Sequence, residues 1–239
     1  MTKAPKILPV MSDCPADIFC FQEAGEVKKA LSQFSQLHNF SRVDAQANNN
    51  NLILSRFPVL QSGEITFPNY GKARFENCLW VDLKTGDKKI RIYNCHFGII
   101  GVGPRQRAEQ LEIVVKHALA ANCPVIICGD LNTTIPNTGM KRTLTRIFHR
   151  EPLTSMVIED KAFDSDERYP FAALAEKWGF KEAADLSQST WCVIPFGFAF
   201  EIFKLKLDWF LTHGLQVKTV SLGSYISDHR SILVSCRFE

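Results

Sequence analysis

The sequence lacks the features by which several classes of protein are recognised. Its eight cysteines include no CxxC pair, and no repeat or low-complexity linker divides its 239 residues. The longest apolar candidate for a membrane span, residues 193–203, contains Pro195, Gly197 and Glu201 and is shorter than the roughly 20 residues that a spanning helix needs. These absences argue against a transmembrane segment, a repeat protein and a zinc site built on paired cysteines.

The sequence also lacks a large excess of positive or negative charge. The net charge is only +3, far from that of a dedicated nucleic-acid-binding protein, although it is compatible with an anionic substrate. Residues 1–10 lack the continuous apolar core of a secretory signal, which predicts a cytoplasmic protein. Several cysteines lie in apolar, strand-like runs, and this favours buried free thiols in a reducing compartment over a disulfide framework.

Apolar runs of strand length alternate with a few stretches of helical periodicity, and we expect one domain over residues 1–239. The strands are expected at residues 17–21, 52–54, 59–67, 78–83, 90–97, 124–128, 205–211, 216–220 and 231–238, and the helices at 26–37, 104–122 and 172–178. Pro104 opens the second helix at its preferred first-turn position. Because strict βαβ alternation is missing, the pattern predicts an α+β sandwich.

Four polar clusters stand where hydrophobic runs stop or start. They are Gln22-Glu23, Asn94 to His96, Gly129-Asp130-Leu131-Asn132 and Ser227-Asp228-His229. Taken singly, each has an ordinary structural explanation, such as a solvated loop glutamate, an Asx turn, a core histidine or a capped strand start. Taken together, they contain what metal-assisted hydrolysis of a phosphate ester needs: oxygen ligands for Mg²⁺, a carboxylate to activate water, and cationic or amide donors to phosphate.

The clusters belong to an ordered set of motifs that resembles a known superfamily. The motifs are Asp17–Glu23 (DIFCFQE), Leu54–Pro58 (LSRFP), Asn94–His96 (NCH), Gly129–Asn132 (GDLN), Leu207–Trp209 (LDW) and Ser227–His229 (SDH). In this order they resemble the endonuclease/exonuclease/phosphatase superfamily, which includes pancreatic deoxyribonuclease, abasic-site endonucleases, neutral sphingomyelinases and inositol polyphosphate 5-phosphatases. The resemblance implies a four-layered α/β/β/α sandwich with two mostly antiparallel sheets packed face to face, and a divalent-metal site at one end.

The resemblance also implies roles for the acidic and amide residues. Glu23 matches the family's metal-binding glutamate, and Asp228 matches a further acidic position near the metal, with Mg²⁺ or Mn²⁺ as the expected ion. Asp130 matches the aspartate that positions or deprotonates the attacking water. Asn132 matches the amide that contacts the phosphate.

The same resemblance implies complementary roles for His229 and His96. His229 matches the histidine that contacts the scissile phosphate or acts as a base, and Asp208 would orient its imidazole. His96 matches a second histidine that helps the leaving oxygen depart, with Glu76 as its suggested carboxylate partner.

One family feature is missing from the sequence. Members begin with a strand that carries an asparagine, which contributes to the metal site before the metal-binding glutamate. Only 22 residues precede Glu23 here, and none is asparagine. We therefore expect either that the chain begins late, or that the usual first strand is absent and another group completes the site.

The segment between two of the motifs bears on the substrate. Trp191 and the phenylalanine-rich loop Phe196–Phe203 correspond to a connection near the site mouth in the family, where they could bind a substrate base, a lipid surface or a partner, or could fold back into the core. The basic stretch Lys141–Arg150 could track a polyanion or form the solvated face of a helix.

The leading hypothesis is a divalent-metal-dependent phosphodiesterase acting on nucleic acid or a related diester, because two histidines suit diester cleavage and the protein is mildly basic. Lipid and inositol phosphates are alternative substrates. A catalytically impaired binding module on the same scaffold is the second hypothesis, and a cysteine-ligated metalloprotein is a distant third. The oligomeric state stays open.

Overall fold

The protein's structure, a computed structural model, describes residues 11, 14–31, 39–45, 51–68, 77–98, 102–133, 167–193, 200–225 and 227–239; the side chains of 192–193 and 200–204 are not part of this description. The described helices are α2 (Gly25–Ala30), α3 (Pro104–Leu119) and α6 (Arg168–Lys177). The strands are β1 (Ile18–Phe21), β2 (Ser41–Asp44), β3 (Leu52–Ser55), β4 (Val59–Ile65), β5 (Asn77–Thr85), β6 (Lys88–His96), β7 (Val125–Asp130), β8 (Lys181–Glu182), β9 (Trp191–Val193), β10 (Phe200–Leu205), β11 (Asp208–His213), β12 (Leu215–Tyr225) and β13 (Arg230–Phe238).

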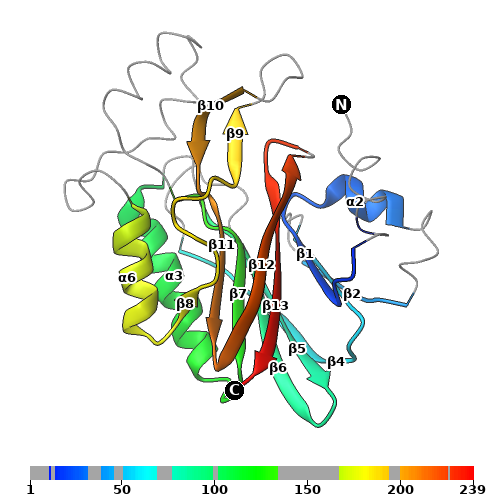
Figure 1. Ribbon diagram of the computed structural model, residues 1–239. Coiled ribbons are helices and arrows are strands. Elements are labelled where there is room, and N and C mark those ends of the chain that lie inside the picture. Colours follow the sequence, from blue (N-terminus) through cyan, green and yellow to red (C-terminus); the bar gives the residue numbers. More distant parts are fainter. Residues whose placement is uncertain are drawn as a thin grey trace.

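The central layer is a six-stranded sheet in the order β4-β5-β6-β7-β11-β8 (Figure 1). Neighbouring strands pair antiparallel except β6 and β7, which are parallel and connected through α3. A parallel pair needs such a crossover, because its strands cannot be joined by a tight turn.

The opposing layer consists of smaller sheets. β1, β3 and β2 form an antiparallel sheet in that order, and β12 pairs with β13. β9 and β10 form a further two-stranded antiparallel sheet. Among the residues that the structure describes, no strand pairing joins the β12–β13 hairpin to the three-stranded sheet. Residues 1–10 lie outside the described residues, so the expectation about the family's first strand stays a prediction.

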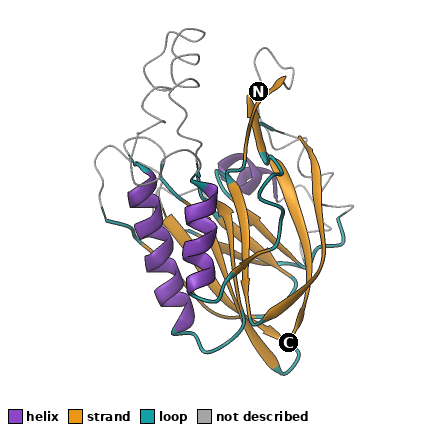
Figure 2. Ribbon diagram, turned by 60° about the vertical axis from the view of Figure 1, so that its left-hand side comes forward, coloured by secondary structure: helices purple, strands orange, loops and turns teal. Residues whose placement is uncertain are grey.

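Three hydrophobic clusters hold these layers together. The first lies between the six-stranded sheet and the helices α3 and α6, which cover its outer face (Figure 2). The second lies between the sheets and includes Ile53, Leu79 and Ile126, and the third lies between the three-stranded sheet and α2. The layers therefore follow the order helix, sheet, sheet, helix, which confirms the predicted α/β/β/α sandwich.

The helices differ from their predicted bounds mainly at their ends. α3 begins at Pro104 as predicted and ends at Leu119, three residues before Asn122. α6 begins at Arg168, four residues before Ala172, because Phe171 and Ala175 together form its buried face. The predicted helix 26–37 is seen as α2 and Leu31, and residues 32–38 lie outside the described residues.

One predicted strand is wrong in its continuity. Residues 205–211 were expected to form a single strand, but β10 ends at Leu205 and β11 begins at Asp208. The backbone N–H groups of Leu207 and Asp208 donate to the Thr190 hydroxyl, at 3.0 and 2.9 Å, and do not continue a ladder. β2 was not predicted, and β12 is longer than the predicted strand 216–220.

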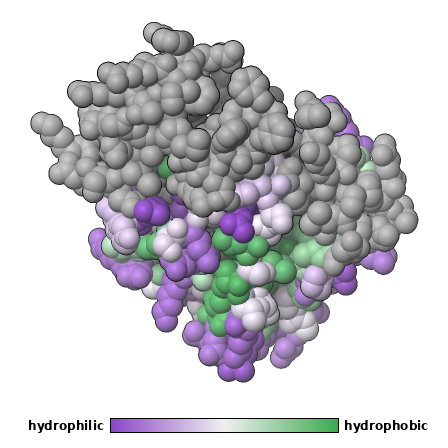
Figure 3. Space-filling model, turned by 45° about the horizontal axis from the view of Figure 1, so that its top comes forward, coloured by the Kyte–Doolittle hydropathy of each residue, from purple (hydrophilic) through white to green (hydrophobic). Residues whose placement is uncertain are grey.

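The surface of the sandwich carries some of its hydrophobic residues. Side chains of Ile18, Cys20, Cys236 and Phe238 pack against the inter-sheet cluster while staying half-buried. Figure 3 shows hydrophobic residues near the middle of one face, with hydrophilic residues below them.

In the part of the chain that is described, no helix combines the length and apolar character needed to cross a membrane. The cysteines whose side chains are described, all but Cys192, are free thiols, as expected.

A buried amide network ties the two sheets together at one end. The Asn94 side chain, fully buried on β6, donates to the carbonyl oxygens of Phe21 and Leu52 at 2.9 and 3.0 Å and accepts from Gln22 at 2.5 Å. Asn51 adds bonds to Asn77 Oδ1 and to the Asn94 carbonyl. Because these groups have little access to water, each needs its partner, and the network fixes β1 and β3 against β6.

Replacing Asn94 by leucine tests this network. The Asn94→Leu variant leaves two buried carbonyls and the Gln22 amide without their partner, and we expect it to lower the free energy of unfolding by about 3 kcal/mol. The same change at the exposed Asn39 is the matched control and should have little effect. Urea unfolding followed by tryptophan fluorescence measures both, and equal, small losses for the two variants would contradict the role of the network.

Candidate active site

Three of the predicted site residues lie in one row across the six-stranded sheet. His96 on β6 is the register partner of Asp130 on β7, and Asp130 is in turn the register partner of Asp208 on β11. Side chains of register partners point to the same face, here the face that looks towards the opposing layer. The strand order therefore brings together residues up to 112 positions apart (208 − 96).

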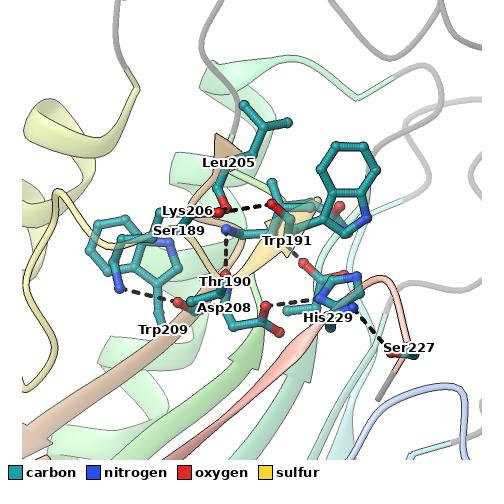
Figure 4. Close-up of polar contacts among 12 residues, drawn as sticks. Ser189, Thr190, Trp191, Leu205, Lys206, Asp208, Trp209, Ser227 and His229 are labelled. Atoms are coloured by element: carbon teal, nitrogen blue, oxygen red, sulfur yellow. Dashed lines mark hydrogen bonds and ion pairs between the residues drawn. The ribbon is translucent and has the colours of Figure 1, made fainter. Parts of the chain in front are cut away.

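The fourth member comes from the opposing layer. His229, just before β13, donates from Nδ1 to Asp208 Oδ2 at 2.8 Å, and its backbone N–H donates to Ser227 Oγ at 3.0 Å (Figure 4). The Nδ1 contact to a carboxylate leaves Nε2 directed towards Asp130, whose Oδ2 lies 3.9 Å away. The contact is compatible with the orienting role predicted for Asp208, which stays a prediction.

Asp130 stands between the two histidines. His96 Nε2 lies 3.9 Å from its Oδ2, the same distance as His229 Nε2. Both separations are too long for direct hydrogen bonds, so a small group such as water or a phosphate oxygen could bind between the three side chains. The other carboxylate oxygen, Oδ1, accepts the backbone N–H of Asn132 at 3.0 Å, which holds the carboxylate in this orientation.

The turn into this cluster depends on glycine. Gly129 has φ +124, and a Cβ at this position would collide with the carbonyl oxygen of Cys95 on the neighbouring strand. Only glycine allows β7 to approach β6 this closely at the residue before Asp130.

Burial is the main reason why Asp130 is a better base than an exposed aspartate. Burial, aided by the charge of Asp208, raises the pKa of Asp130 to about 6, although His229 and His96 act in the opposite direction. A carboxylate with a pKa near neutrality accepts a proton more readily and is still ionised at pH 7.

His229 has the opposite character. Burial alone lowers its pKa, but the charge and hydrogen bond of Asp208, together with the charges of Asp130 and Asp228, outweigh burial and raise the pKa to about 10. At neutral pH the imidazolium form therefore predominates, with its Nε2–H free to donate towards a phosphate oxygen.

The predicted substrate-binding residues lie next to this cluster. Asn132 is buried with φ 52, and its amide donates to the Phe97 carbonyl at 2.7 Å, which leaves its second N–H for a ligand. Trp191 begins β9, is half-buried, and forms an isolated antiparallel bridge with His229 (Figure 4). Both positions are compatible with the predicted roles, which stay predictions.

The predicted metal ligands are carboxylates at the ends of β1 and before β13. Glu23 is exposed and has φ 51, and Asp228 is half-buried beside His229. Among the described residues, no three His, Cys, Asp or Glu side chains converge as a closed metal cage. Mg²⁺ usually binds to one or two carboxylates and keeps several waters, so an oxygen donor set of this size fits it better than zinc, which needs more ligands.

Three further predicted features fall outside the description. Glu76, the suggested partner of His96, and the stretch Lys141–Arg150 lie outside the described residues, as do residues 196–199 of the loop Phe196–Phe203. The possible contact of this loop with lipid stays a prediction.

The structure adds supporting residues whose roles were not predicted. Lys206 is buried, pairs with Glu182 at 3.0 Å and donates to the Asp208 carbonyl at 3.2 Å. Thr190 contacts the backbone of Asp208. Thr190 precedes Trp191, and Lys206 precedes the Leu207-Asp208-Trp209 motif, which was the only signal in the sequence for these two residues. The contact between Thr190 and Asp208 joins residues 18 positions apart and leaves no periodic pattern in the sequence.

The sequence also matches the model of a known protein family. Residues 3–229 match the model of the Endonuclease/Exonuclease/phosphatase family. Among curated proteins, none matches the sequence.

Solved structures share the fold at low sequence identity. D. rerio TDP2 complexed with a single-strand DNA product has 14% identity and a TM-score of 0.68, covering 99% of this chain and 92% of that one. An endonuclease/exonuclease/phosphatase from Bacteroides vulgatus has 14% identity and a TM-score of 0.67, covering 100% and 90%. ANGEL2, a 2',3'-cyclic phosphatase in complex with adenosine-2',3'-vanadate, has 16% identity and a TM-score of 0.65, covering 99% and 86%.

The buried carboxylate of Asp130 should cost stability. Its pKa is raised in the folded state, so folding takes up a proton between about pH 4 and pH 6, and the ionised group opposes folding above about pH 6. Asp130→Asn mimics the protonated side chain, and we expect it to increase the free energy of unfolding on the order of 2 kcal/mol at pH 7.

The gain should disappear below about pH 3, where the wild-type carboxyl is largely protonated in both states. Urea unfolding at the two pH values measures it, with the exposed Asp87→Asn as control. If Asp130→Asn instead lowered the free energy of unfolding at pH 7, the ionised carboxylate of Asp130 would not be destabilising the folded protein.

Proposed function

The chain belongs to the endonuclease/exonuclease/phosphatase family, and from that premise we propose that it is a divalent-metal-dependent phosphoesterase, specifically a phosphodiesterase acting on nucleic acid or a related diester. The observation that carries the proposal is the arrangement of Asp130 Oδ2 at 3.9 Å from the Nε2 atoms of both His96 and His229. A base and two proton donors or acceptors thus surround one space, as hydrolysis of a phosphate ester requires.

Each side chain has a role that follows from its protonation state. Asp130, ionised at pH 7, accepts a proton from the attacking water. His229, kept protonated and oriented by Asp208, donates from Nε2 to a non-bridging phosphate oxygen as negative charge develops. His96, on the other side of Asp130, is placed to protonate the leaving oxygen, and the remaining N–H of Asn132 contacts the phosphate.

Glu23 and Asp228 would hold the metal ion, Mg²⁺ or Mn²⁺. When bound, the ion supplies positive charge to the phosphate and stabilises the charge of the transition state. The protein's own contribution is to orient the water, the phosphate and the proton donors.

Nucleic acid is the substrate class with the most support. TDP2, a structural neighbour, was solved with a single-strand DNA product, and ANGEL2 with an adenosine-2',3'-vanadate. In this chain, the half-buried indole of Trp191 lies beside His229 and offers an aromatic surface on which a base can stack.

Activity measurements test the proposal directly. The purified protein should hydrolyse bis(p-nitrophenyl) phosphate with Mg²⁺ or Mn²⁺, and Asp130→Asn and His229→Gln should each lower kcat by about 10² to 10⁴-fold while the proteins stay folded. His213→Gln, at the far end of β11, is the matched control and should keep normal activity. Full activity in the Asp130→Asn, His229→Gln double variant would refute the mechanism.

A panel of single-stranded DNA, RNA, a 2',3'-cyclic nucleotide, sphingomyelin and inositol phosphates then identifies the substrate class. Preference for the lipid or inositol phosphates would replace the nucleic-acid assignment without affecting the mechanism.

The pH dependence of kcat/KM provides an independent check. The rate should rise through about pH 6 as Asp130 loses its proton and fall near about pH 10 as His229 loses its proton. Asp208→Asn removes a charge that raises the pKa of both His229 and Asp130, so the alkaline limb should move to lower pH, and the acidic limb should move in the same direction. An alkaline limb that does not move would separate Asp208 from the titration of His229.

A further inference from the structure

Thr190 lies at the point where the two layers of the site meet. It is fully buried, and its Oγ1 accepts two backbone hydrogen bonds, from Leu207 N at 3.0 Å and from Asp208 N at 2.9 Å (Figure 4). These two N–H groups belong to the break between β10 and β11, where the ladder does not satisfy them. The hydroxyl therefore replaces a strand as the hydrogen-bond partner of the residue that orients His229.

The backbone of Thr190 contacts the other half of the same pair. Its carbonyl accepts the N–H of Arg230, the residue after His229, at 2.8 Å, and its own N–H donates to Leu205 at 3.0 Å. The next residue, Trp191, forms the isolated bridge with His229. Thr190 thus binds the segment of Asp208 through its side chain and the segment of His229 through its main chain.

We propose that Thr190 is a positioning residue of the site: its hydroxyl holds the Asp208 backbone at the distance from which the carboxylate can bind His229. This inference rests on the proposed function. Asp208 and His229 come from opposite layers, and their 2.8 Å contact depends on how those layers are held at this point. A shift of the Asp208 backbone by about half an ångström would weaken an oriented hydrogen bond between them.

Removal of the side-chain hydroxyl would leave two buried N–H groups without the acceptor that they have now. Leu207 and Asp208 are buried, with 4% and 9% of their surface exposed, so water has little access to their N–H groups if the hydroxyl is removed. Valine has the shape of threonine but cannot accept a hydrogen bond, and the chain would have to move to satisfy these donors. Serine keeps the acceptor and loses only a methyl group.

The test compares Thr190→Val with Thr190→Ser, using Thr212→Val as the matched control. Thr212 is also buried, lies on β11 at the end away from the site, and its hydroxyl is 3.4 Å from the Lys181 carbonyl. We expect Thr190→Val to lower kcat about 10- to 100-fold with KM nearly unchanged, and Thr190→Ser to restore most of the rate. Thr212→Val should keep the kcat of the unaltered protein.

The decisive readout is the Nδ1–H proton of His229 that is hydrogen-bonded to Asp208, observed as a downfield ¹H NMR resonance and assigned by its loss in His229→Gln. In Thr190→Val the weakened contact should move this resonance upfield or broaden it, and Thr190→Ser and Thr212→Val should leave it in place. A purely structural role would reduce the stability of Thr190→Val without changing this resonance or kcat, and that result would overturn the proposal.

Two outcomes keep the test independent of other failures. If the unaltered protein hydrolyses no phosphate ester, the proposed function fails, while the Nδ1–H resonance of His229 still decides the role of Thr190. If Thr190→Val does not fold, Thr190→Ala takes its place, because it removes the hydroxyl without adding an apolar methyl group next to the free N–H groups. An unchanged Nδ1–H resonance in the alanine variant would equally overturn the proposal.

Discussion

The register of three neighbouring strands is the constraint on which the site depends. His96, Asp130 and Asp208 point to the same face in one row because β6, β7 and β11 pair at these residues. Since side chains alternate along a strand, a slip of β7 by one residue would turn Asp130 into the helix-facing core. The hydrophobic alternation of these strands, which buries Ile126 and Cys128 on one face and Val125 and Ile127 on the other, protects the chemistry as well as the fold.

Charge is concentrated in the site at the expense of stability. Asp130 is nearly buried, and its two nearest imidazoles lie 3.9 Å from its Oδ2, so its burial makes it a stronger base but opposes folding. The contact between Asp208 and His229 compensates in part, because it joins the two layers by a charge-assisted hydrogen bond. Beside these charged groups, neutral amides around Asn94 join the same layers without adding charge. The polar end of the sandwich thus combines groups that hold it together with groups that react.

The sequence predicted the layers and the main site residues because both leave local signals. Apolar runs ending in polar residues located β1, β6 and β7, and the ordered motifs placed Asp130, Asp208 and His229 in one site. The break at Lys206–Leu207 was not predictable, since residues 205–211 are apolar enough for one strand and the hydroxyl that interrupts it belongs to Thr190. The hydrogen bond between Gln22 and Asn94, which are 72 positions apart, could not be predicted either. It arises from the packing of two sheets and leaves no periodic pattern in the sequence.

The connection between β12 and β13 carries His229, and among the described residues this hairpin pairs with no other named strand. Its described main-chain links to the neighbouring segment are the isolated bridge between His229 and Trp191 and the hydrogen bond from the Arg230 N–H to the Thr190 carbonyl. Elements with few such links can open locally before the whole protein unfolds. Such an opening would separate His229 from Asp208, and a ligand that contacts both layers would favour the closed arrangement.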